Sequence, residues 1–279
     1  MINLNPPQHI GISLYDDITS KKNNDRKNRL GNLRSLVNQR YTEYLTKIYN
    51  LHEIIPLSHL SDEEKIDLQS CYSNNVELNK KEIIIKKMQT ISMQAVCPYC
   101  GISEPDTLDH YLPKGTFPEF SVLSINLIPS CGTCNRNKGE KWLEGETRRI
   151  INFYYDQLPN EKVLNIHIEY VQESDIPVIS FSLSNEVGIT ESFFNTIEFH
   201  YRDLHLFERF SKQVSDKFTG IYLELLEGVS VLSIEEQKDN IQRRINSLTK
   251  RYGLNHWEVC LYEAVLNSDF FFNRIYQRN

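Results

Sequence analysis

Hydrophobic side chains recur at steps of three and four residues in two long stretches of the chain, which predicts amphipathic helices there. In residues 21–49, Leu30 and Leu33 would share one face of such a helix. From about residue 191 onward, a longer stripe of aromatic and aliphatic positions has the same period. It ends at Gly228, a residue type that commonly terminates helices. The pattern predicts helices at both ends of the chain.

Local signals indicate where several helices begin. Residues 61–64 and 233–236 both have the Ser-x-x-Glu pattern of a capping box, in which two side chains satisfy backbone N–H groups at a helix start. A further helix is expected over about residues 77–93. A Pro-Pro pair near the N-terminus argues against helix, so residues 1–20 are expected to be irregular.

Strand-like patterns lie in the middle of the chain. Residues 163–170 alternate between apolar and polar side chains, and residues 177–183 have a similar pattern, which predicts a small antiparallel sheet. Residues 150–155 are also rich in side chains that favour strands. Terminal helices combined with a small antiparallel sheet indicate the α+β class.

Composition and charge narrow the class of protein. The 279 residues are 40% hydrophobic and 24% charged, as in ordinary soluble proteins. No secretory signal is recognised, and no apolar run approaches the roughly 20 residues of a membrane-spanning helix, so we expect a cytoplasmic protein without a membrane segment. Because the net charge is −6, any attraction to nucleic acid must come from local patches.

One such patch lies in the first long helix. Its polar face carries eight basic side chains against two acidic ones, Asp25 and Glu43. Charge runs are usually solvated, which favours a solvated helix face over a phosphate-tracking surface. The eight basic residues are Lys21, Lys22, Arg26, Lys27, Arg29, Arg34, Arg40 and Lys47.

Four of the six cysteines form two CxxC pairs, Cys97 with Cys100 and Cys131 with Cys134. Four thiolates at this spacing suit a tetrahedral Zn²⁺ ion, and a site closed by four protein ligands is structural rather than catalytic. Two disulfides or four free thiols are the alternatives. Both are disfavoured, because paired cysteines in a cytoplasmic protein more often bind metal.

Polar residues able to take part in acid–base chemistry lie between and just after the cysteine pairs. Asp109 and His110 belong to a short strand-like run, Asn126 precedes a second one, and Asn135 follows Cys134 in a helix expected to reach about residue 146. Zinc would clamp this strand, loop, strand and helix at both ends. Each residue alone has an ordinary structural explanation as a buried histidine, a cap or a turn residue.

Together, residues 97–142 resemble the zinc-containing form of the HNH (His-Me finger, ββα-metal) endonuclease motif. The resemblance implies that His110 is the general base and that Asp109 and Asn135 hold a catalytic Mg²⁺ or Mn²⁺ ion. It also implies that Asn126 orients His110. Asn135 stands where many members have histidine, which changes the metal shell. Three basic side chains are expected to contact neighbouring phosphates. They are Lys114, Arg136 and Lys138.

The residue patterns and the resemblance together predict a three-part organisation: a helical region over residues 1–90, the nuclease core over 91–150, and a β-hairpin with a helical region over 151–279. DNA is the expected substrate. An RNA-directed nuclease is one alternative, and a zinc-stabilised module that binds nucleic acid or protein through an inactive centre is another. Outside the motif, the arrangement resembles HNH proteins of Septu-like anti-phage systems, which implies an ABC-type ATPase partner.

Overall fold

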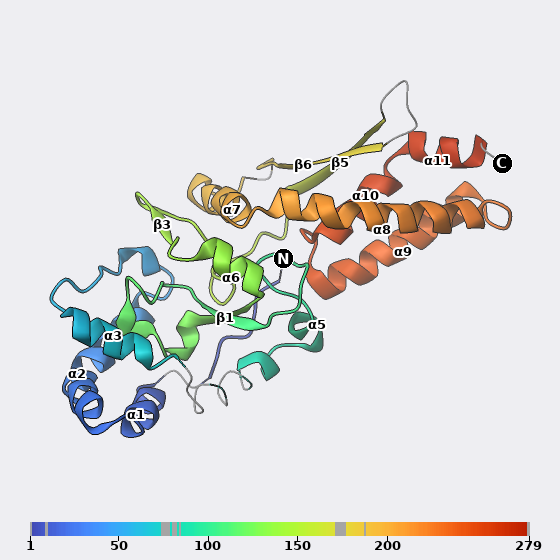
Figure 1. The fold of residues 1–279 in the computed structure, drawn as a ribbon. Coiled ribbons are helices and arrows are strands. Elements are labelled where there is room, and N and C mark those ends of the chain that lie inside the picture. The colour runs from blue at the N-terminus through green and yellow to red at the C-terminus, as the bar shows by residue number, and fades with distance from the viewer. Residues whose placement is uncertain are drawn as a thin grey trace. The chain divides into compact units, whose positions relative to one another are not determined.

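The computed structural model describes residues 2–8, 11–73, 79, 83, 85–170, 177–186 and 188–277. The chain is divided into two compact units, whose elements are labelled in Figure 1. The N-terminal unit consists of Asn3–Gln157 with Asn195–Leu204. The C-terminal unit consists mainly of Leu158–Phe194 and His205–Asn279.

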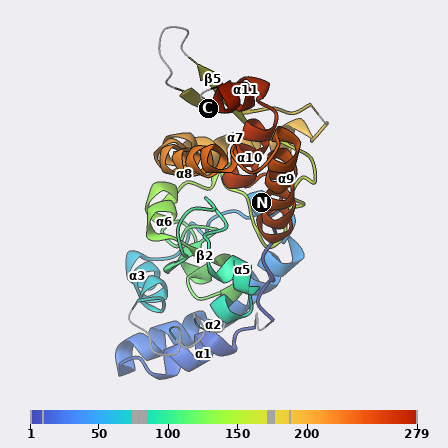
Figure 2. The same cartoon turned by 90° about the vertical axis from the view of Figure 1, so that its right-hand side faces the viewer.

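The N-terminal unit begins with a group of helices. Asn23 caps the long helix, because its side chain accepts a hydrogen bond from the backbone N–H of Arg26. Two views show the first two helices side by side (Figures 1 and 2). The elements are α1 (Ser13–Ser20), α2 (Asn24–Thr46), η1 (Leu51–Glu53) and α3 (Asp62–Ser70).

Helix α1 corrects the expectation that residues 1–20 are irregular. Leu14, Tyr15 and Ile18 are buried, and the Tyr15 hydroxyl donates to the Leu30 carbonyl of α2 at 2.7 Å. No side chain caps the start of α1, so its local sequence carries no start signal. Packing against α2 therefore stabilises α1. A stretch of eight residues is too short for its hydrophobic periodicity to predict a helix.

The centre of the N-terminal unit has the predicted order of strand, loop, strand and helix. Strand β1 pairs with β2 in antiparallel register, with Asp109 opposite Ile128. The helix is shorter than expected, because Gly139 ends it with a positive φ of 50° and a two-stranded hairpin follows. The elements are α5 (Ile91–Gln94), β1 (Thr107–His110), η2 (Pro118–Phe120), η3 (Ser124–Asn126), β2 (Leu127–Ser130), α6 (Gly132–Lys138), β3 (Leu143–Glu144) and β4 (Thr147–Arg148).

The C-terminal unit combines the predicted hairpin with helices. The two strands are antiparallel, with Ile166 opposite Phe181, and β5 packs on α10. The Asn255 side chain fixes the start of the hairpin by accepting from the backbone N–H groups of Val163 and Leu164. The elements are β5 (Leu164–Tyr170), β6 (Pro177–Leu183), α8 (Leu206–Gly228), α9 (Ile234–Tyr252), α10 (Trp257–Leu266) and α11 (Asp269–Gln277).

Both predicted capping boxes are confirmed, at the starts of α3 and α9. The long aromatic stripe is interrupted, however. Helix α7 (Glu191–Asp203) ends before α8 begins, and His205 between them has a left-handed φ of 53°. The C-terminal end of the chain likewise holds two separate helices, α10 and α11. Periodicity continues across such breaks because both helices still face a core.

Two other expected elements, a strand over residues 150–155 and a helix over residues 77–93, differ from the structure at least in part. Residues 150–155 contain no strand: residues 150–152 are irregular and residues 153–155 form a turn, although Ile150, Ile151 and Phe153 are buried. Of the helix expected over residues 77–93, residues 77, 78, 80–82 and 84 lie outside the described part, and residues 79, 83 and 85–87 are helical as expected. Residues 88–90 are not helical, and α5 starts after Thr90, whose side chain caps it.

Helices with small antiparallel two-stranded sheets confirm the α+β class. The three-part division at residues 90 and 150 stays a prediction, because the two units are defined by compactness and not by independent folding. No described helix combines the length and the apolar character that crossing a membrane requires.

Candidate functional site

The four predicted cysteine ligands come together in the N-terminal unit. The sulfur atoms of Cys97, Cys100, Cys131 and Cys134 all lie within 4.8 Å of one another, and all four residues are buried. None of them is in a disulfide. The sulfur atoms of Cys100 and Cys131 are 3.9 Å apart. Four Zn–S bonds of about 2.3 Å in tetrahedral geometry place sulfur atoms roughly 3.8 Å apart. The thiol cluster fits zinc in number, chemistry and spacing.

Hydrogen bonds shape the two knuckles of this cluster. The Cys97 N–H donates to the Ser103 carbonyl at 2.6 Å, and Gly101 takes a positive φ of 65° directly after the second sulfur. In the other knuckle, the Gly132 N–H donates to a carboxylate oxygen of Asp106 at 2.6 Å. Cys131 is the N-cap residue of α6. The cluster therefore ties the start of α6 to the segment that precedes β1.

Asp109 lies in β1 with its carboxylate buried and surrounded by donors. The residue is 3% exposed. The Tyr99 hydroxyl donates to Oδ2 at 2.8 Å, and the Lys138 ammonium lies 3.2 Å from the same oxygen and 3.3 Å from Oδ1. Burial raises the pKa of the Asp109 carboxyl, and the nearby Lys138 charge opposes that shift. Tyr99 comes from the first cysteine pair, so this hydrogen bond joins the thiol cluster to Asp109.

His110, the next residue of β1, projects from the opposite face of the strand. Its Nε2 lies 2.9 Å from the Ser121 carbonyl oxygen, and the residue is 7% exposed. A carbonyl only accepts, so Nε2 carries the proton and the neutral ring keeps its lone pair on Nδ1. Burial lowers the pKa of His110 to about 3, which favours the neutral ring.

Asn126 organises the loop that holds His110. It is fully buried. Its Oδ1 accepts from the Leu112 N–H at 2.8 Å, and its Nδ2 donates to the carbonyls of Leu112 and Phe120 at 3.0 and 3.4 Å. The loop clamped in this way leads directly to Ser121, whose carbonyl contacts the His110 ring. Asn126 thus acts on His110 through the backbone.

Helix α6 lies along β1 and contacts alternate carbonyls of that strand. The Asn135 side chain donates through Nδ2 to Thr107 Oγ1 at 3.1 Å and to the Leu108 carbonyl at 3.4 Å. One helical turn later, Lys138 donates to the His110 carbonyl at 2.6 Å. Both of these hydrogen bonds use Nδ2, so the side-chain oxygen of Asn135 stays open to a ligand.

The three residues expected to contact phosphates differ in their exposure to solvent. Lys138 is fully buried, and its ammonium is used by Asp109 and by the His110 carbonyl, so its assignment as a phosphate ligand is corrected to a structural role. Arg136 is exposed on α6 and donates to Thr133 Oγ1 at 3.4 Å. Lys114 is partly exposed, with its ammonium 4.8 Å from the centre of the Tyr72 ring.

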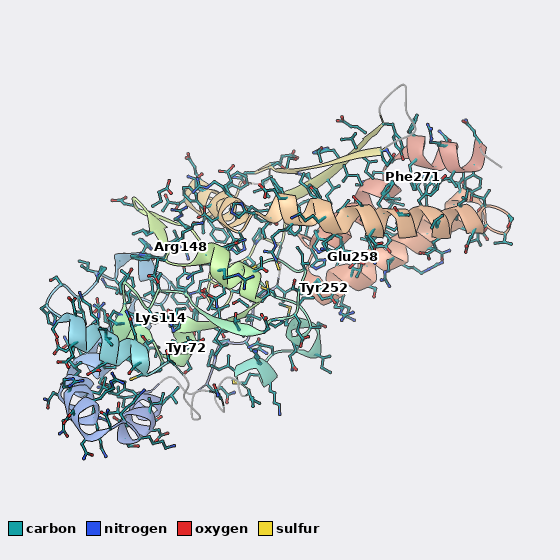
Figure 3. The ribbon with its side chains drawn as sticks, in the orientation of Figure 1. Tyr72, Lys114, Arg148, Tyr252, Glu258 and Phe271 are labelled. Atoms are coloured by element: carbon teal, nitrogen blue, oxygen red, sulfur yellow. The ribbon has the colours of Figure 1, made fainter. Side chains whose placement is uncertain are left out.

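Tyr72 is a site residue that the sequence did not indicate. Its ring meets the His110 ring at a centroid distance of 4.3 Å and an angle of 66°, and its hydroxyl donates to the Leu108 carbonyl at 2.9 Å. Tyr72 and Lys114 can be followed in Figure 3. Tyr72 follows α3, outside residues 97–142, so no spacing within the motif could have identified it. Tyr99, in contrast, could have been noticed from its place inside the first CxxC pair.

Two known proteins are similar to this chain. Protein ea31 of Escherichia phage lambda is 26% identical over 224 residues, which cover 76% of this chain and 75% of that protein. Septu protein PtuB of Bacillus thuringiensis is 29% identical over 87 residues, which cover 30% of this chain and only 34% of PtuB. No model of a known protein family matches the chain, and no solved structure is similar to it.

Proposed function

We propose that this protein is a metal-dependent HNH endonuclease that hydrolyses phosphodiester bonds of DNA. The observation that carries the proposal is the environment of His110. A carbonyl binds Nε2, which leaves Nδ1 as the basic nitrogen, and the ring is held between that carbonyl and Tyr72. A fixed imidazole with one free basic nitrogen suits a general base that activates water.

Asp109 and Asn135 would supply oxygen donors for a hard divalent cation, which would take the place of the Lys138 ammonium that contacts both Asp109 oxygens in this structure. Asn135 bonds to the carbonyl of the residue that precedes Asp109, so both side chains lie beside the same part of β1. A carboxylate and an amide oxygen, completed by water and phosphate, suit Mg²⁺ or Mn²⁺. Bound there, the cation would neutralise charge on the phosphate and on the departing oxygen.

The reaction assigned to these residues is a hydrolysis. The Nδ1 atom of His110 takes a proton from water, and the water oxygen forms a bond to phosphorus while the bond to the departing 3′ oxygen breaks. The departing oxygen then takes up a proton from solvent. The zinc-type thiol cluster takes no part in these steps, because all four of its ligand positions belong to the protein. Its proposed role is to hold β1 and α6 together.

The alternatives of the sequence analysis make different predictions. An inactive, zinc-stabilised binding module would bind nucleic acid or a partner protein without cleaving nucleic acid under any metal. An RNA-directed nuclease would cut RNA in preference to DNA. The arrangement around His110 favours an active centre, because packing against Tyr72 and the bond to Ser121 leave Nδ1 of the ring without a partner among the described residues.

We also propose a role in anti-phage defence together with an ABC-type ATPase. This role is supported by the partial similarity to the Septu protein PtuB and by the resemblance stated for the sequence. It predicts that expression of the chain with such an ATPase, encoded beside it, protects bacteria from phage. Protection by cells that carry the His110→Ala variant with the same ATPase would contradict it.

A substrate panel tests the nuclease proposal. Purified protein is incubated with supercoiled plasmid, single-stranded DNA and structured RNA, each with Mg²⁺, with Mn²⁺ or with no added metal. The proposal predicts that plasmid is nicked or linearised only when a divalent cation is present. Cleavage confined to RNA would favour the RNA nuclease, and binding without cleavage under every metal would favour the inactive module.

A further inference from the structure

Helix α9 of the C-terminal unit presents a basic face that the proposed chemistry does not use. Between Asp239 and Glu258 the sequence has four basic side chains and no acidic one. All four are exposed. They are Arg243, Arg244, Lys250 and Arg251. This concentration of positive charge contrasts with the net charge of −6 of the whole chain.

The four cations form two short rows on one side of the helix. With 3.6 residues per turn, Arg243 and Lys250 lie on one line and Arg244 and Arg251 on the next, each pair about 10.5 Å apart along the axis. Ser247 lies between the rows and is exposed. The opposite side of the helix carries its buried residues, among them Ile241, Ile245 and Leu248. The basic face is therefore turned away from the core.

These cations are largely free of carboxylates. Among the described residues, Arg243, Lys250 and Arg251 form no ion pair; the first donates to the neutral Asn240 side chain, and the last lies 4.6 Å from the centre of the Tyr252 ring. Arg244 lies 3.9 Å from a Glu258 oxygen. That oxygen is also contacted by Lys217 at 2.6 Å, so the negative charge of Glu258 is already paired.

The basic residues of α2 show the opposite arrangement. Arg26 and Arg29 each contact Asp67 at 2.6 Å, and Arg34 contacts Asp16 at 2.7 Å. Arg40 binds Glu119 at 2.8 Å as well as Glu43, and Lys47 lies 3.7 Å from Glu53. Five of the eight basic side chains in residues 21–47 are thus paired with carboxylates of the protein, which disfavours a phosphate-tracking surface as expected.

We infer that the basic face of α9 binds the sugar-phosphate backbone of double-stranded DNA. Arginine and lysine side chains that have no carboxylate partner within the protein are available to phosphates. When they contact phosphates, they displace counterions condensed on the DNA, and this release is the main source of non-specific affinity for DNA. A membrane surface is a poorer fit, because insertion needs exposed apolar side chains, and the aliphatic residues of α9 beside the basic face, Ile241, Ile245 and Leu248, are buried. The inference adds a DNA-binding surface to the proposed nuclease, so it rests on the proposed function.

The test compares two double variants that lose the same charge. Arg243→Gln with Lys250→Gln removes one row of the α9 face, and Lys27→Gln with Lys212→Gln removes two exposed lysines elsewhere. Binding of the full-length chain to a fluorescently labelled DNA duplex is measured by anisotropy over a series of salt concentrations, without added Mg²⁺ or Mn²⁺. Anionic lipid vesicles are titrated in parallel.

We expect the α9 variant to bind DNA about tenfold more weakly, with the slope of log affinity against log salt reduced by about 1.8, as the loss of two phosphate contacts requires. In the control variant, both the affinity for DNA and the slope against salt should stay close to the wild-type values. Equal losses in both variants, unchanged binding by the α9 variant, or preferential binding to vesicles would each overturn the inference. Wild-type protein that binds duplex through α9 without cutting it contradicts only the proposed function. Protein that cuts DNA while the α9 variant binds normally contradicts only this inference.

Discussion

The thiol cluster and the polar cluster around His110 lie in the same short motif but are built differently. The thiol cluster is complete within residues 97–134, and its four sulfur atoms need only each other and a metal ion. The polar cluster depends on groups from elsewhere: Tyr72 against the His110 ring and Tyr44, whose hydroxyl lies 3.3 Å from Asn126 Oδ1. The comparison teaches that the metal scaffold is local, whereas the proposed chemistry is supported by the surrounding helices.

Removing the scaffold should have the largest effect. Cys131→Ser deprives the cluster of one thiolate, and structural zinc can contribute about 10 kcal/mol or more to folding, which exceeds the stability of many domains. We expect the N-terminal unit to lose its cooperative unfolding transition and the protein to lose its zinc. Thermal melting followed by circular dichroism, with zinc measured by mass spectrometry, checks this outcome.

Cys71→Ser is the matched control, since Cys71 is also a buried free thiol of the N-terminal unit. It should keep one zinc per chain and a cooperative transition at slightly lower temperature. A zinc-free wild type that melts as sharply as a zinc-loaded one would show that the cluster is not the scaffold.

The next largest effect should come from the buried ion pair between Lys138 and Asp109. Lys138→Met leaves the Asp109 carboxylate buried without its cation, and breaking a buried pair in this way typically costs about 3–5 kcal/mol. Urea unfolding should show this loss, and the double variant with Asp109→Asn should recover part of it. A loss below about 1 kcal/mol, the range typical of an exposed ion pair, would contradict the structural role of Lys138.

The pH dependence of stability tests the buried contact between His200 and Tyr99, a residue of the first CxxC pair. His200 donates from Nε2 to the Tyr99 carbonyl at 2.8 Å, and burial lowers the pKa of His200 to about 4. The unfolded chain binds a proton below about pH 6.5, so the contribution of the neutral ring is complete above that pH and is lost as the pH falls towards 4.

Between pH 8 and pH 5, this single group should remove about 2 kcal/mol of stability. His200→Gln cannot take up the proton, so its stability should fall less over the same range, whatever its stability at pH 8. Denaturant titrations of both proteins at the two pH values provide the measurement. Parallel losses in the two proteins would exclude His200 as the source.

The smallest effect should come from Tyr72. Replacing it with leucine removes the ring that holds His110, and a small displacement of a catalytic group can cost tenfold or more in rate. We expect Tyr72→Leu to lower kcat about tenfold with little change in KM, and Tyr72→Phe, which keeps the ring, to retain most activity. The ¹⁵N signals of the His110 ring should show a single Nε2–H tautomer in wild type and averaging in Tyr72→Leu. Unchanged signals would assign Tyr72 a purely structural role.

Sequence reasoning succeeded where the signals are local. The paired cysteines, the two short strands and the capping boxes all follow from neighbouring residues, and the structure contains them. It failed where distant packing decides the outcome. Helix α1 exists because it packs on α2, and Lys138 is buried because Asp109 faces it. Tyr72 reaches His110 from outside the motif, and only the fold brings them together.

The most direct measurement is the single-turnover rate of plasmid cleavage by wild type and by His110→Ala, with Mg²⁺ or Mn²⁺, at equal zinc content and equal melting temperature. The account predicts that His110→Ala cleaves about 10²–10⁴-fold more slowly, the usual contribution of a general base. Equal rates for the two proteins would contradict it.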